Sequence, residues 1–210
     1  LLTSTALATT APLVIAPAMD ADMWASPATQ ANAETLRQRG AVLVGPGRGR
    51  LASGRMGLGR LVSVEEIVAA IRATLGRNGP LAGLRVLVTA GGTQEPLDPV
   101  RHLTNRSSGK MGYAVAEAAR DAGAHVTLIS APTGLPQPFG IDYVAVRTAA
   151  DMHAAVMERT AETDVLIMSA AVADYRPAQM SEHKIKKGDG GLTLPLERTI
   201  DILQAVAGVR

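Results

Sequence analysis

The stretch Arg85-Val-Leu-Val-Thr89 decides the fold, because it is a continuous run of leucine and β-branched residues. Such runs are typical of strands that are buried on both faces, as in a parallel sheet covered by helices. Further strands are predicted at 125–130, 143–146 and 164–169, and helices at 109–122 and 149–160. Strands that alternate with helices of this length indicate βαβ units. Residues 84–210 are therefore predicted to form a Rossmann-like, doubly wound parallel α/β sheet.

The helix predicted at 109–122 is amphipathic. Met111, Val115 and Ala118 recur at helical spacing and share one face, which we expect to be the buried one. Gly123 follows directly, and glycine is favoured just past the end of a helix.

The N-terminal third is predicted to be a separate, smaller α/β part. Strands are predicted at 12–16 and 41–44, and helices at 27–39 and 64–75, the last capped by Ser63 with Glu66 at the capping-box position. Residues 45–60 hold six glycines and four arginines, which predicts a segment too flexible for a regular element. Residues 76–83 are predicted to be a linker that separates a domain at 1–75 from one at 84–210.

Composition narrows the class of protein. With 210 residues and 47% hydrophobic content, the chain can bury the core of one large or two small domains. No run reaches the roughly 18 apolar residues of a membrane helix, and no basic segment precedes residues 1–18, so neither membrane insertion nor a signal peptide is expected. The absence of cysteine fits a cytoplasmic protein. A net charge of +2 and 2% aromatic residues do not favour nucleic-acid binding.

Two glycines follow the first strand of the larger part. Gly91 and Gly92 could let the backbone approach a phosphate at the carboxyl end of the strand, where ligands bind in open α/β sheets. The spacing is neither G-x-G-x-x-G nor that of a Walker A loop. A simple tight turn therefore explains the pair as well as a phosphate site does.

A second polar motif, His102-Leu-Thr-Asn-Arg-Ser-Ser-Gly-Lys-Met-Gly112, precedes the predicted helix. Ser107, Ser108 and Lys110 place two hydroxyls and an ammonium at the helix N-terminus, where the backbone favours anions. Asn105 could orient a carbonyl or carboxylate with its amide. Plain serine capping would need only one of these residues, so a phosphate role is favoured.

A third motif, Ser169-Ala-Ala-Val-Ala-Asp-Tyr-Arg-Pro177, leaves the last predicted strand. Ala170 and Ala171 would admit a flat ring or a ribose, and Asp174 could accept from a base or ribose or hold Mg²⁺. Lys184-Ile-Lys-Lys187 follows and could neutralise a triphosphate, although three lysines in four positions are often only a solvated surface.

These motifs together resemble a known family. The runs 98–112, 170–176 and 184–187 look like the ligase half of bacterial bifunctional phosphopantothenoylcysteine decarboxylase/phosphopantothenate–cysteine ligase. Pro17-Ala-Met-Asp-Ala-Asp-Met-Trp24 resembles the substrate-recognition motif of the decarboxylase half, and Leu51-Ala-Ser-Gly-Arg-Met-Gly-Leu-Gly-Arg60 resembles its substrate-clamp loop. The resemblance covers essentially the whole chain and implies the C-terminal part of a flavodoxin-like flavoprotein domain followed by most of a CTP-dependent ligase domain.

The resemblance implies a reaction in two steps. The carboxylate of 4′-phosphopantothenate attacks the α-phosphate of CTP, which gives an acyl-cytidylate and pyrophosphate; the amine of cysteine then displaces CMP. Asn105 is the residue expected to assist turnover of the acyl-cytidylate. The expected nucleotide contacts are Met168, Ser169, Ala170, Asp174 and Lys184, with Lys186 and Lys187 nearby. Mg²⁺ is expected with CTP, FMN in a complete decarboxylase domain, and a homo-oligomer as the assembly.

Four residues depart from the pattern of the family. Ser53 stands where the family has a proton-donating cysteine, and a hydroxyl is a much weaker acid than a thiol. Asp20 replaces an asparagine, so its carboxylate would repel the carboxylate of the substrate unless protonated or bridged by a cation. Decarboxylation by this chain is therefore not expected, although a longer parent could use a variant acid. Thr199-Ile200 replaces an Asn-Pro pair, and the ligase domain is expected to continue past residue 210.

Two other functions stay open. A nicotinamide-dependent reductase could use a similar sheet, but the glycine fingerprint is absent and Ser130, not an acidic residue, ends the second strand. A non-catalytic flavoprotein partner would have lost both sites, whereas Asn105, Asp174 and Lys184 are all present.

Overall fold

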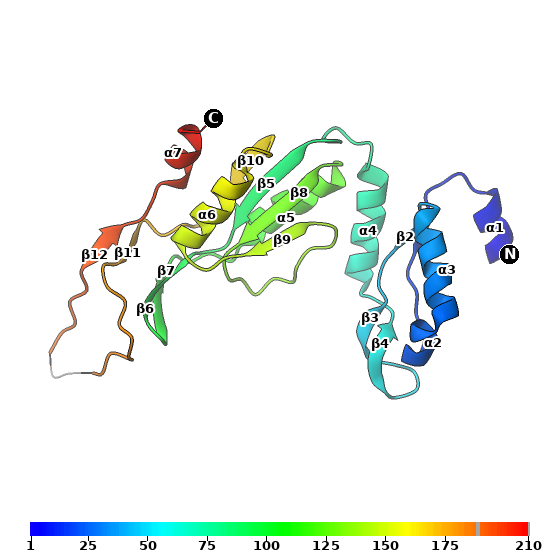
Figure 1. The fold of residues 1–210 in the computed structure, drawn as a ribbon, viewed down its shortest axis with the longest axis horizontal. Helices are drawn as coiled ribbons and strands as arrows, with labels where there is room; N and C mark the ends of the chain where they lie inside the picture. The colour runs from blue at the N-terminus through cyan, green and yellow to red at the C-terminus, as the bar shows by residue number, and fades with distance from the viewer. Residues whose placement is uncertain (188–189, 210) are drawn as a thin grey trace. The chain divides into compact units, whose positions relative to one another are not determined.

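The computed structural model describes residues 1–187 and 190–209. The chain divides into two compact units, residues 1–77 and 78–210, and this division falls inside the predicted linker (Figure 1). Each unit is described by itself. No helix within the described ranges is long and apolar enough to cross a membrane.

The larger unit is built on a parallel sheet of four strands. The strands are β5 (Arg85–Ala90), β8 (His125–Ser130), β9 (Asp142–Ala145) and β10 (Val165–Met168), in the order β10-β5-β8-β9. Thr89 pairs with Met168 on one side and with Ile129 on the other, so the carboxyl ends of three strands lie level. The chain order of the strands reverses between β5 and β10, which makes this the topological switch point of a Rossmann-like sheet. The predicted fold class is confirmed.

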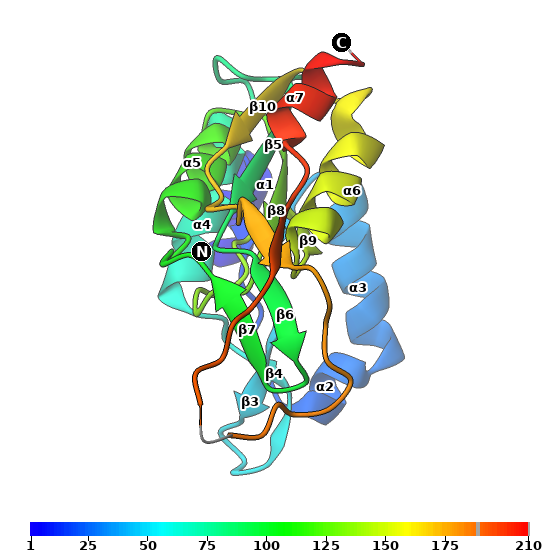
Figure 2. The same cartoon turned by 90° about the vertical axis from the view of Figure 1, so that its left-hand side faces the viewer.

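Helices cover both faces of this sheet, because the strands are apolar on both faces. Figure 2 shows α5 (Lys110–Asp121) on one side and α6 (Ala149–Thr160) and α7 (Ile202–Ala207) on the other. Val86 and Val88 pack into the cluster under α5, whereas Leu87 packs into the cluster under α6 and α7. Leu87 and Val88 are almost completely buried. The run that predicted the fold therefore forms the centre of the core.

The predicted buried face of α5 was wrong for Met111 and Ala118, which are exposed, while Val115 is partly buried against the core. Gly112, Tyr113, Ala116 and Ala119 are buried, whereas Met111 is 71% exposed. The cause is the close packing of α5 on β5: a Cβ atom added at Gly112 would lie 2.6 Å from the Cβ of Ala90. The helix turns its small residues inward to permit this approach, so its largest aliphatic residue points outward.

Short antiparallel pairs, which were not predicted, extend the larger unit beyond the sheet. They are β6 (Gln94–Asp98) with β7 (Arg101–Thr104), and β11 (Tyr175–Pro177) with β12 (Leu196–Arg198). Their sequences are short and polar and contain proline, so they lack the alternation that predicts strands. β6, β7 and β11 arise from segments that were expected to be binding loops, and β12 lies outside the predicted motifs.

The smaller unit holds a two-stranded parallel sheet, β1 (Val14–Ile15) with β2 (Val42–Leu43). Its helices are α1 (Leu2–Ala8), α2 (Ala21–Ala25), α3 (Pro27–Gln38) and α4 (Val64–Gly76). Ser63 caps α4 as predicted, since its hydroxyl accepts from the backbone N–H of Glu66 at 3.1 Å.

The prediction that residues 45–60 are too flexible for a regular element was wrong. They form a hairpin of β3 (Gly47–Arg50) and β4 (Met56–Arg60). Gly57 and Gly59 alternate inward, while Leu58 and Arg60 point outward. A Cβ atom at Gly59 would lie 2.2 Å from the carbonyl oxygen of Met19. The glycines therefore allow a close backbone contact with the 17–24 motif and do not make the segment irregular.

Candidate nucleotide site at the switch point

The loops that follow β5 and β10 are joined beyond the sheet. The N–H of Ala171 donates to the carbonyl of Gly91 at 2.8 Å, and the N–H of Thr93 donates to the carbonyl of Ala171 at 3.2 Å. Gly92 and Ala171 form an isolated parallel bridge. The structure thus brings two of the predicted motifs into direct contact at the switch point, where ligands bind in folds of this kind.

Two buried threonines fix the loop after β10. The hydroxyl of Thr89 accepts from the N–H of Ala170 at 3.2 Å, and the hydroxyl of Thr93 accepts from the N–H of Ala173 at 2.9 Å. Both threonines are fully buried. Thr89 and Thr93 therefore hold residues 170–173 from the buried side of the loop.

The chain's own backbone fills the space beside Gly91 and Gly92. Gly91 has φ of +80°, and a Cβ atom there would lie 2.8 Å from the carbonyl oxygen of Ala131. At Gly92, a Cβ atom would lie 2.7 Å from the carbonyl oxygen of Asn105. The tight-turn interpretation therefore accounts for both glycines, and their role as phosphate ligands stays a prediction.

A pocket of about 810 Å³ opens beside the joined loops. One wall contains Met168, Ala170 and Asp174, three of the predicted nucleotide contacts. Ser169 lies between them in sequence but does not line the pocket, and its buried hydroxyl oxygen has no hydrogen-bond partner among the described residues. The volume falls within the usual range for small-molecule sites.

A second group of residues that line the pocket was not predicted as part of the site. It comprises Arg198, Thr199, Ile200, Asp201, Ile202, Leu203 and Gln204, at the end of β12 and the start of α7. The hydroxyl of Thr199 donates to the carbonyl of Ala173 at 2.6 Å, and its N–H donates to the carbonyl of Asp174 at 3.0 Å. Asp201 caps α7 by accepting from the N–H of Gln204 at 2.9 Å. An aspartate before an apolar run is a helix-start signal that could have indicated the start of α7, but it does not indicate that this helix lies beside the pocket.

Asn105 contacts the loop that follows β10. Its amide nitrogen donates to the carbonyl of Val172 at 3.0 Å, and Val172 lines the pocket. Asn105 is exposed and does not line the pocket itself. The amide is thus oriented by the loop, and its oxygen is available to a ligand at the surface.

The start of α5 presents the polar groups that were expected there. Ser107, Ser108 and Lys110 are exposed, and none of them lines the pocket. The hydroxyl of Ser107 accepts from the N–H of Gly109 at 3.3 Å, while Gly109 is the N-cap residue, with φ of +72°. The serines therefore contribute to local capping, and their binding of an anion stays a prediction.

The lysine run lies away from the pocket. Lys184, Lys186 and Lys187 are exposed and are not among its lining residues. The backbone of Ile185 contacts Asp98 and Arg101 at the turn between β6 and β7. The lysines are thus not part of the pocket wall that holds Met168, Ala170 and Asp174, and their binding of a triphosphate stays a prediction.

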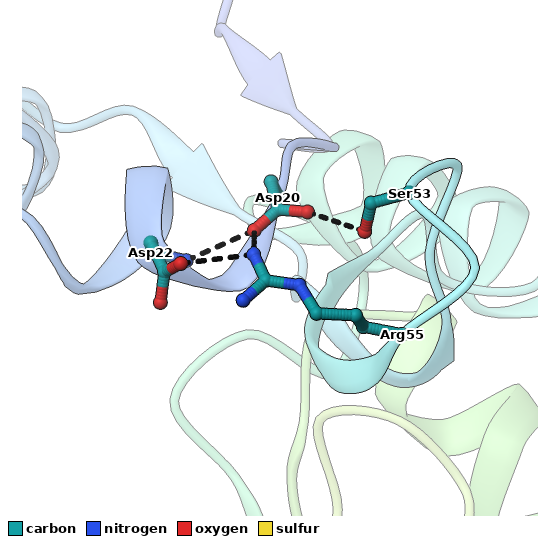
Figure 3. A network of polar contacts seen from close by, with 4 residues as sticks. All are labelled: Asp20, Asp22, Ser53 and Arg55. Atoms are coloured by element: carbon teal, nitrogen blue, oxygen red, sulfur yellow. Dashed lines mark hydrogen bonds and ion pairs between the residues drawn. The ribbon is translucent and has the colours of Figure 1, made fainter.

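In the smaller unit, the two residues that depart from the family pattern contact each other (Figure 3). The hydroxyl of Ser53 donates to Asp20 at 2.6 Å, and Arg55 bridges Asp20 at 2.5 Å and Asp22 at 2.9 Å. The hydrogen bond from Ser53, the N–H of Asp22 and the charge of Arg55 together lower the pKa of Asp20. Arg55 therefore pairs with this carboxylate and offsets its charge. The hydroxyl proton of Ser53 is committed to Asp20, so Ser53 is poorly placed to act as an acid.

The end of β8 does not favour a reductase. Ser130 is 1% exposed, and its hydroxyl donates to the carbonyl of Ala131 at 2.8 Å. It also lies 3.2 Å from the hydroxyl of Tyr113. A ribose hydroxyl would not reach this oxygen, so the position that binds the ribose in dinucleotide-binding folds is closed here.

Carboxylates are sparse at the site. Within residues 1–187 and 190–209, no cluster of three or more Asp, Glu or His side chains is placed to hold a metal ion. Asp174 and Asp201 both line the pocket. One or two carboxylates suffice for Mg²⁺ that also coordinates substrate phosphates.

Fold and site together define the larger unit as a Rossmann-like α/β domain with a small-molecule site at its switch point. The chain belongs to the DNA/pantothenate metabolism flavoprotein family, whose C-terminal domain matches residues 81–210. A second family, described as Flavoprotein, matches residues 1–76, which agrees with the predicted flavodoxin-like part.

Curated relatives agree with this assignment. The chain is 49% identical over 216 residues to the coenzyme A biosynthesis bifunctional protein CoaBC of Mycobacterium tuberculosis, covering 100% of this chain and 52% of the relative. It is 48% identical over 207 residues to CoaBC of Bacillus subtilis, covering 97% of this chain and 51% of the relative. The chain thus spans about half the length of the curated relatives that it matches.

Solved structures are similar mainly over the larger part of the chain. The C-terminal domain of a CoaBC protein matches with a TM-score of 0.55 and 47% identity, over 62% of this chain and 61% of that one. The DNA/pantothenate metabolism flavoprotein of Streptococcus pneumoniae matches with a TM-score of 0.54 and 30% identity, over 60% of this chain and 65% of that one. A Cab2 variant in complex with phosphopantothenate-cysteine matches with a TM-score of 0.51 and 18% identity, over 66% of this chain and 62% of that one. At this identity the match shows only that the fold is shared.

Proposed function

We propose that the larger unit is the ligase domain of a coenzyme A biosynthesis enzyme that joins 4′-phosphopantothenate to cysteine with CTP and Mg²⁺. The observation that carries the proposal is the pocket at the switch point, because Met168, Ala170 and Asp174 meet there. Membership of the pantothenate metabolism flavoprotein family supports the substrate class. A cytoplasmic homo-oligomer is part of the same proposal.

The reaction needs orientation and charge neutralisation more than a covalent nucleophile. In the proposed assignment, the cytidine ring enters the pocket along Ala170, whose small side chain leaves room for it. Asp174 accepts from the nucleotide or shares Mg²⁺ with its phosphates. Asn105 acts on the acyl group, and Lys184 with its neighbours neutralises the triphosphate. The second candidate, a nicotinamide-dependent reductase, is disfavoured by the buried Ser130.

Calorimetry tests this proposal directly. CTP with Mg²⁺ is expected to bind the chain, whereas NADPH is not. Changing Ala170 to phenylalanine should weaken CTP binding by about tenfold or more, because the ring would occupy space inside the pocket. Ala114→Phe, at an exposed position of α5, is the matched control and should leave binding unchanged. Heat with NADPH and none with CTP would instead support the reductase.

For the smaller unit, we propose that it forms part of an FMN-dependent decarboxylase domain in a longer protein. The space beside the glycines of β4 is taken by the 17–24 motif, because a Cβ atom at Gly57 would lie 2.8 Å from the Cβ of Ala21 and one at Gly59 would lie 2.2 Å from the carbonyl oxygen of Met19. These glycines therefore form no cradle for a flavin, and no step is assigned through FMN here. At the position where the family has its proton-donating cysteine, this chain has Ser53 in a polar network with Asp20 and Arg55. Ser53 there is bound to a carboxylate, which makes its proton hard to release to a substrate.

Changing Ser53 to cysteine in the longer protein is therefore expected to increase the release of CO₂ by about tenfold or more, because a thiol is several pKa units more acidic than a hydroxyl. Ser53→Ala should not increase it. The measurement is CO₂ release from phosphopantothenoylcysteine by the FMN-loaded protein. If cysteine and alanine at this position give equal rates, the acid is supplied by another group.

A further inference from the structure

The segment that carries the three lysines is held by the turn of the β6–β7 hairpin. It belongs to the connection between β11 and β12, and in both views it runs past this hairpin (Figures 1 and 2). The N–H of Ser181 donates to the carbonyl of Leu97 at 3.0 Å. The stronger attachment is at Ile185, where both backbone groups of one residue are bound by side chains.

Asp98 is the centre of this attachment. Its Oδ1 accepts from the N–H groups of Val100 at 2.9 Å and Arg101 at 2.8 Å, which is the usual arrangement of an aspartate that stabilises a turn. Its Oδ2 accepts from the N–H of Ile185 at 3.1 Å, 87 residues away in the chain. A turn alone needs only the first oxygen. The second oxygen therefore has a separate role, which is to hold the lysine segment.

Arg101 completes the clamp. Its Nη2 donates to the carbonyl of Ile185 at 3.2 Å, while its Nη1 lies 3.6 Å from Oδ2 of Asp98. The side chain of Asp98 is fully buried. Burial raises the pKa of Asp98, but the N–H groups of Val100, Ile185 and Arg101 and the charge of Arg101 outweigh it and lower the pKa. The carboxylate is thus ionised at neutral pH and binds through charge-assisted hydrogen bonds.

The clamp formed by Asp98 and Arg101 contacts the backbone of the segment at Ile185, and these contacts do not involve the lysine side chains. Both contacts to Ile185 go to its N–H and carbonyl groups, and Ile185 is itself half-buried, whereas Lys184 and Lys186 are exposed. A free lysine loses rotational freedom when it binds a phosphate, and a segment that is already fixed reduces the further loss of backbone freedom. Fixing Ile185 thus sets the position from which both neighbouring ammonium groups reach out.

We propose that Asp98 and Arg101 are positioning residues that fix the backbone at Ile185, so that Lys184 and Lys186 are presented to a nucleoside triphosphate. The identity of the ligand rests on the proposed ligase function. The clamp itself rests on the contacts of Asp98 and Arg101 alone.

Limited proteolysis tests the clamp without any ligand. Trypsin cleaves after lysine, so the rate of cutting at Lys184, Lys186 and Lys187 reports how often the segment leaves the hairpin. Asp98→Ala is expected to accelerate cutting there by about tenfold or more, since local opening governs cleavage. Glu162→Ala, which removes an exposed carboxylate of the same unit, is the control. Equal cutting in the wild type and the Asp98 variant would overturn the proposal.

A second variant keeps the test valid if Asp98→Ala unfolds the unit. Arg101→Ala leaves the carboxylate and its backbone turn contacts in place, and it removes the donor to the carbonyl of Ile185 together with the ion pair to Asp98. It should also accelerate cutting, and hydrogen exchange of the N–H of Ile185 should become faster, while the circular dichroism stays that of the wild type. Unchanged exchange and unchanged cutting in a folded Arg101 variant would equally refute the clamp.

Activity assays on the longer protein test whether Asp98 and Arg101 position the lysines. Asp98→Ala should lower CTP-dependent pyrophosphate release, and it should add little to the loss caused by Lys184→Ala, because both variants remove one function. Additive losses, or full activity despite faster cutting, would refute positioning. If the wild type shows no CTP-dependent reaction, the ligase proposal fails while the proteolysis result still decides on the clamp.

Discussion

Replacing Asn105 with alanine is expected to reduce amide formation by about 100-fold or more, the usual cost of losing one oriented polar group from a transition state. CTP-dependent pyrophosphate release should persist better than amide formation. The reason is the position of the side chain: its amide nitrogen is held by the carbonyl of Val172, while Asn105 itself is exposed and does not line the pocket. In the proposed assignment it acts on the acyl group and makes no contact with the cytidine.

Two assays on the longer protein separate these steps. Pyrophosphate release measures formation of the acyl-cytidylate, and the amide product measures its turnover by cysteine. Asn78→Ala, which removes an exposed asparagine outside the site, should change neither. An equal loss of both steps would contradict the role given to Asn105 and would indicate that its bond to Val172 merely maintains the loop.

The architecture of the larger unit could be predicted from the sequence because its strands are buried on both faces. The strand at 85–89 can be predicted without knowing which strands pair with it, because its continuous apolar character is visible in the local sequence. The helix at 149–160 was predicted with the bounds that the structure has. Its Thr148 and Asp151 form a capping box, in which each side chain accepts from a backbone N–H of the other residue.

The hairpins could not be predicted because their strands are stabilised by distant contacts. Asp98 shows the reason, because one of its oxygens binds its own turn and the other binds Ile185. The second contact joins residues that are far apart in the sequence, so no local pattern predicts it. The same limit applies to β3 and β4. There, Gly59 is required by the carbonyl of Met19, and glycine content alone suggested an irregular segment.

The candidate site was predicted in part. Ala170 and Asp174 were expected at the site because they follow a strand at the carboxyl edge of the sheet, and Met168 was added by the resemblance to the family; the pocket is lined by all three. The wall from Arg198 to Gln204 depends on how β12 returns to the sheet edge, which spacing along the chain does not indicate. The lysine run was expected to face the same ligand. Its position at the hairpin turn explains why a separate clamp is needed to place it.

Changing Gly112 to alanine is expected to destabilise the larger unit, although two effects oppose each other. Alanine is favoured over glycine inside a helix by about 1 kcal/mol, so α5 alone would gain stability. The added Cβ atom, however, would lie 2.6 Å from the Cβ of Ala90 and 2.8 Å from the carbonyl oxygen of Thr89. Neither atom can move without shifting β5, and overpacking of a core costs about 1–3 kcal/mol.

The contact should therefore outweigh the propensity, and valine at this position should destabilise still more. Thermal or urea unfolding measures the change, with Gly134→Ala as control, because a Cβ atom at Gly134 meets nothing within 4 Å. A more stable Gly112→Ala variant would show that α5 does not approach β5 this closely. Because Thr89, at the end of β5, holds Ala170 in the pocket wall, a shift of this strand should also weaken CTP binding in a Gly112→Ala protein that still folds.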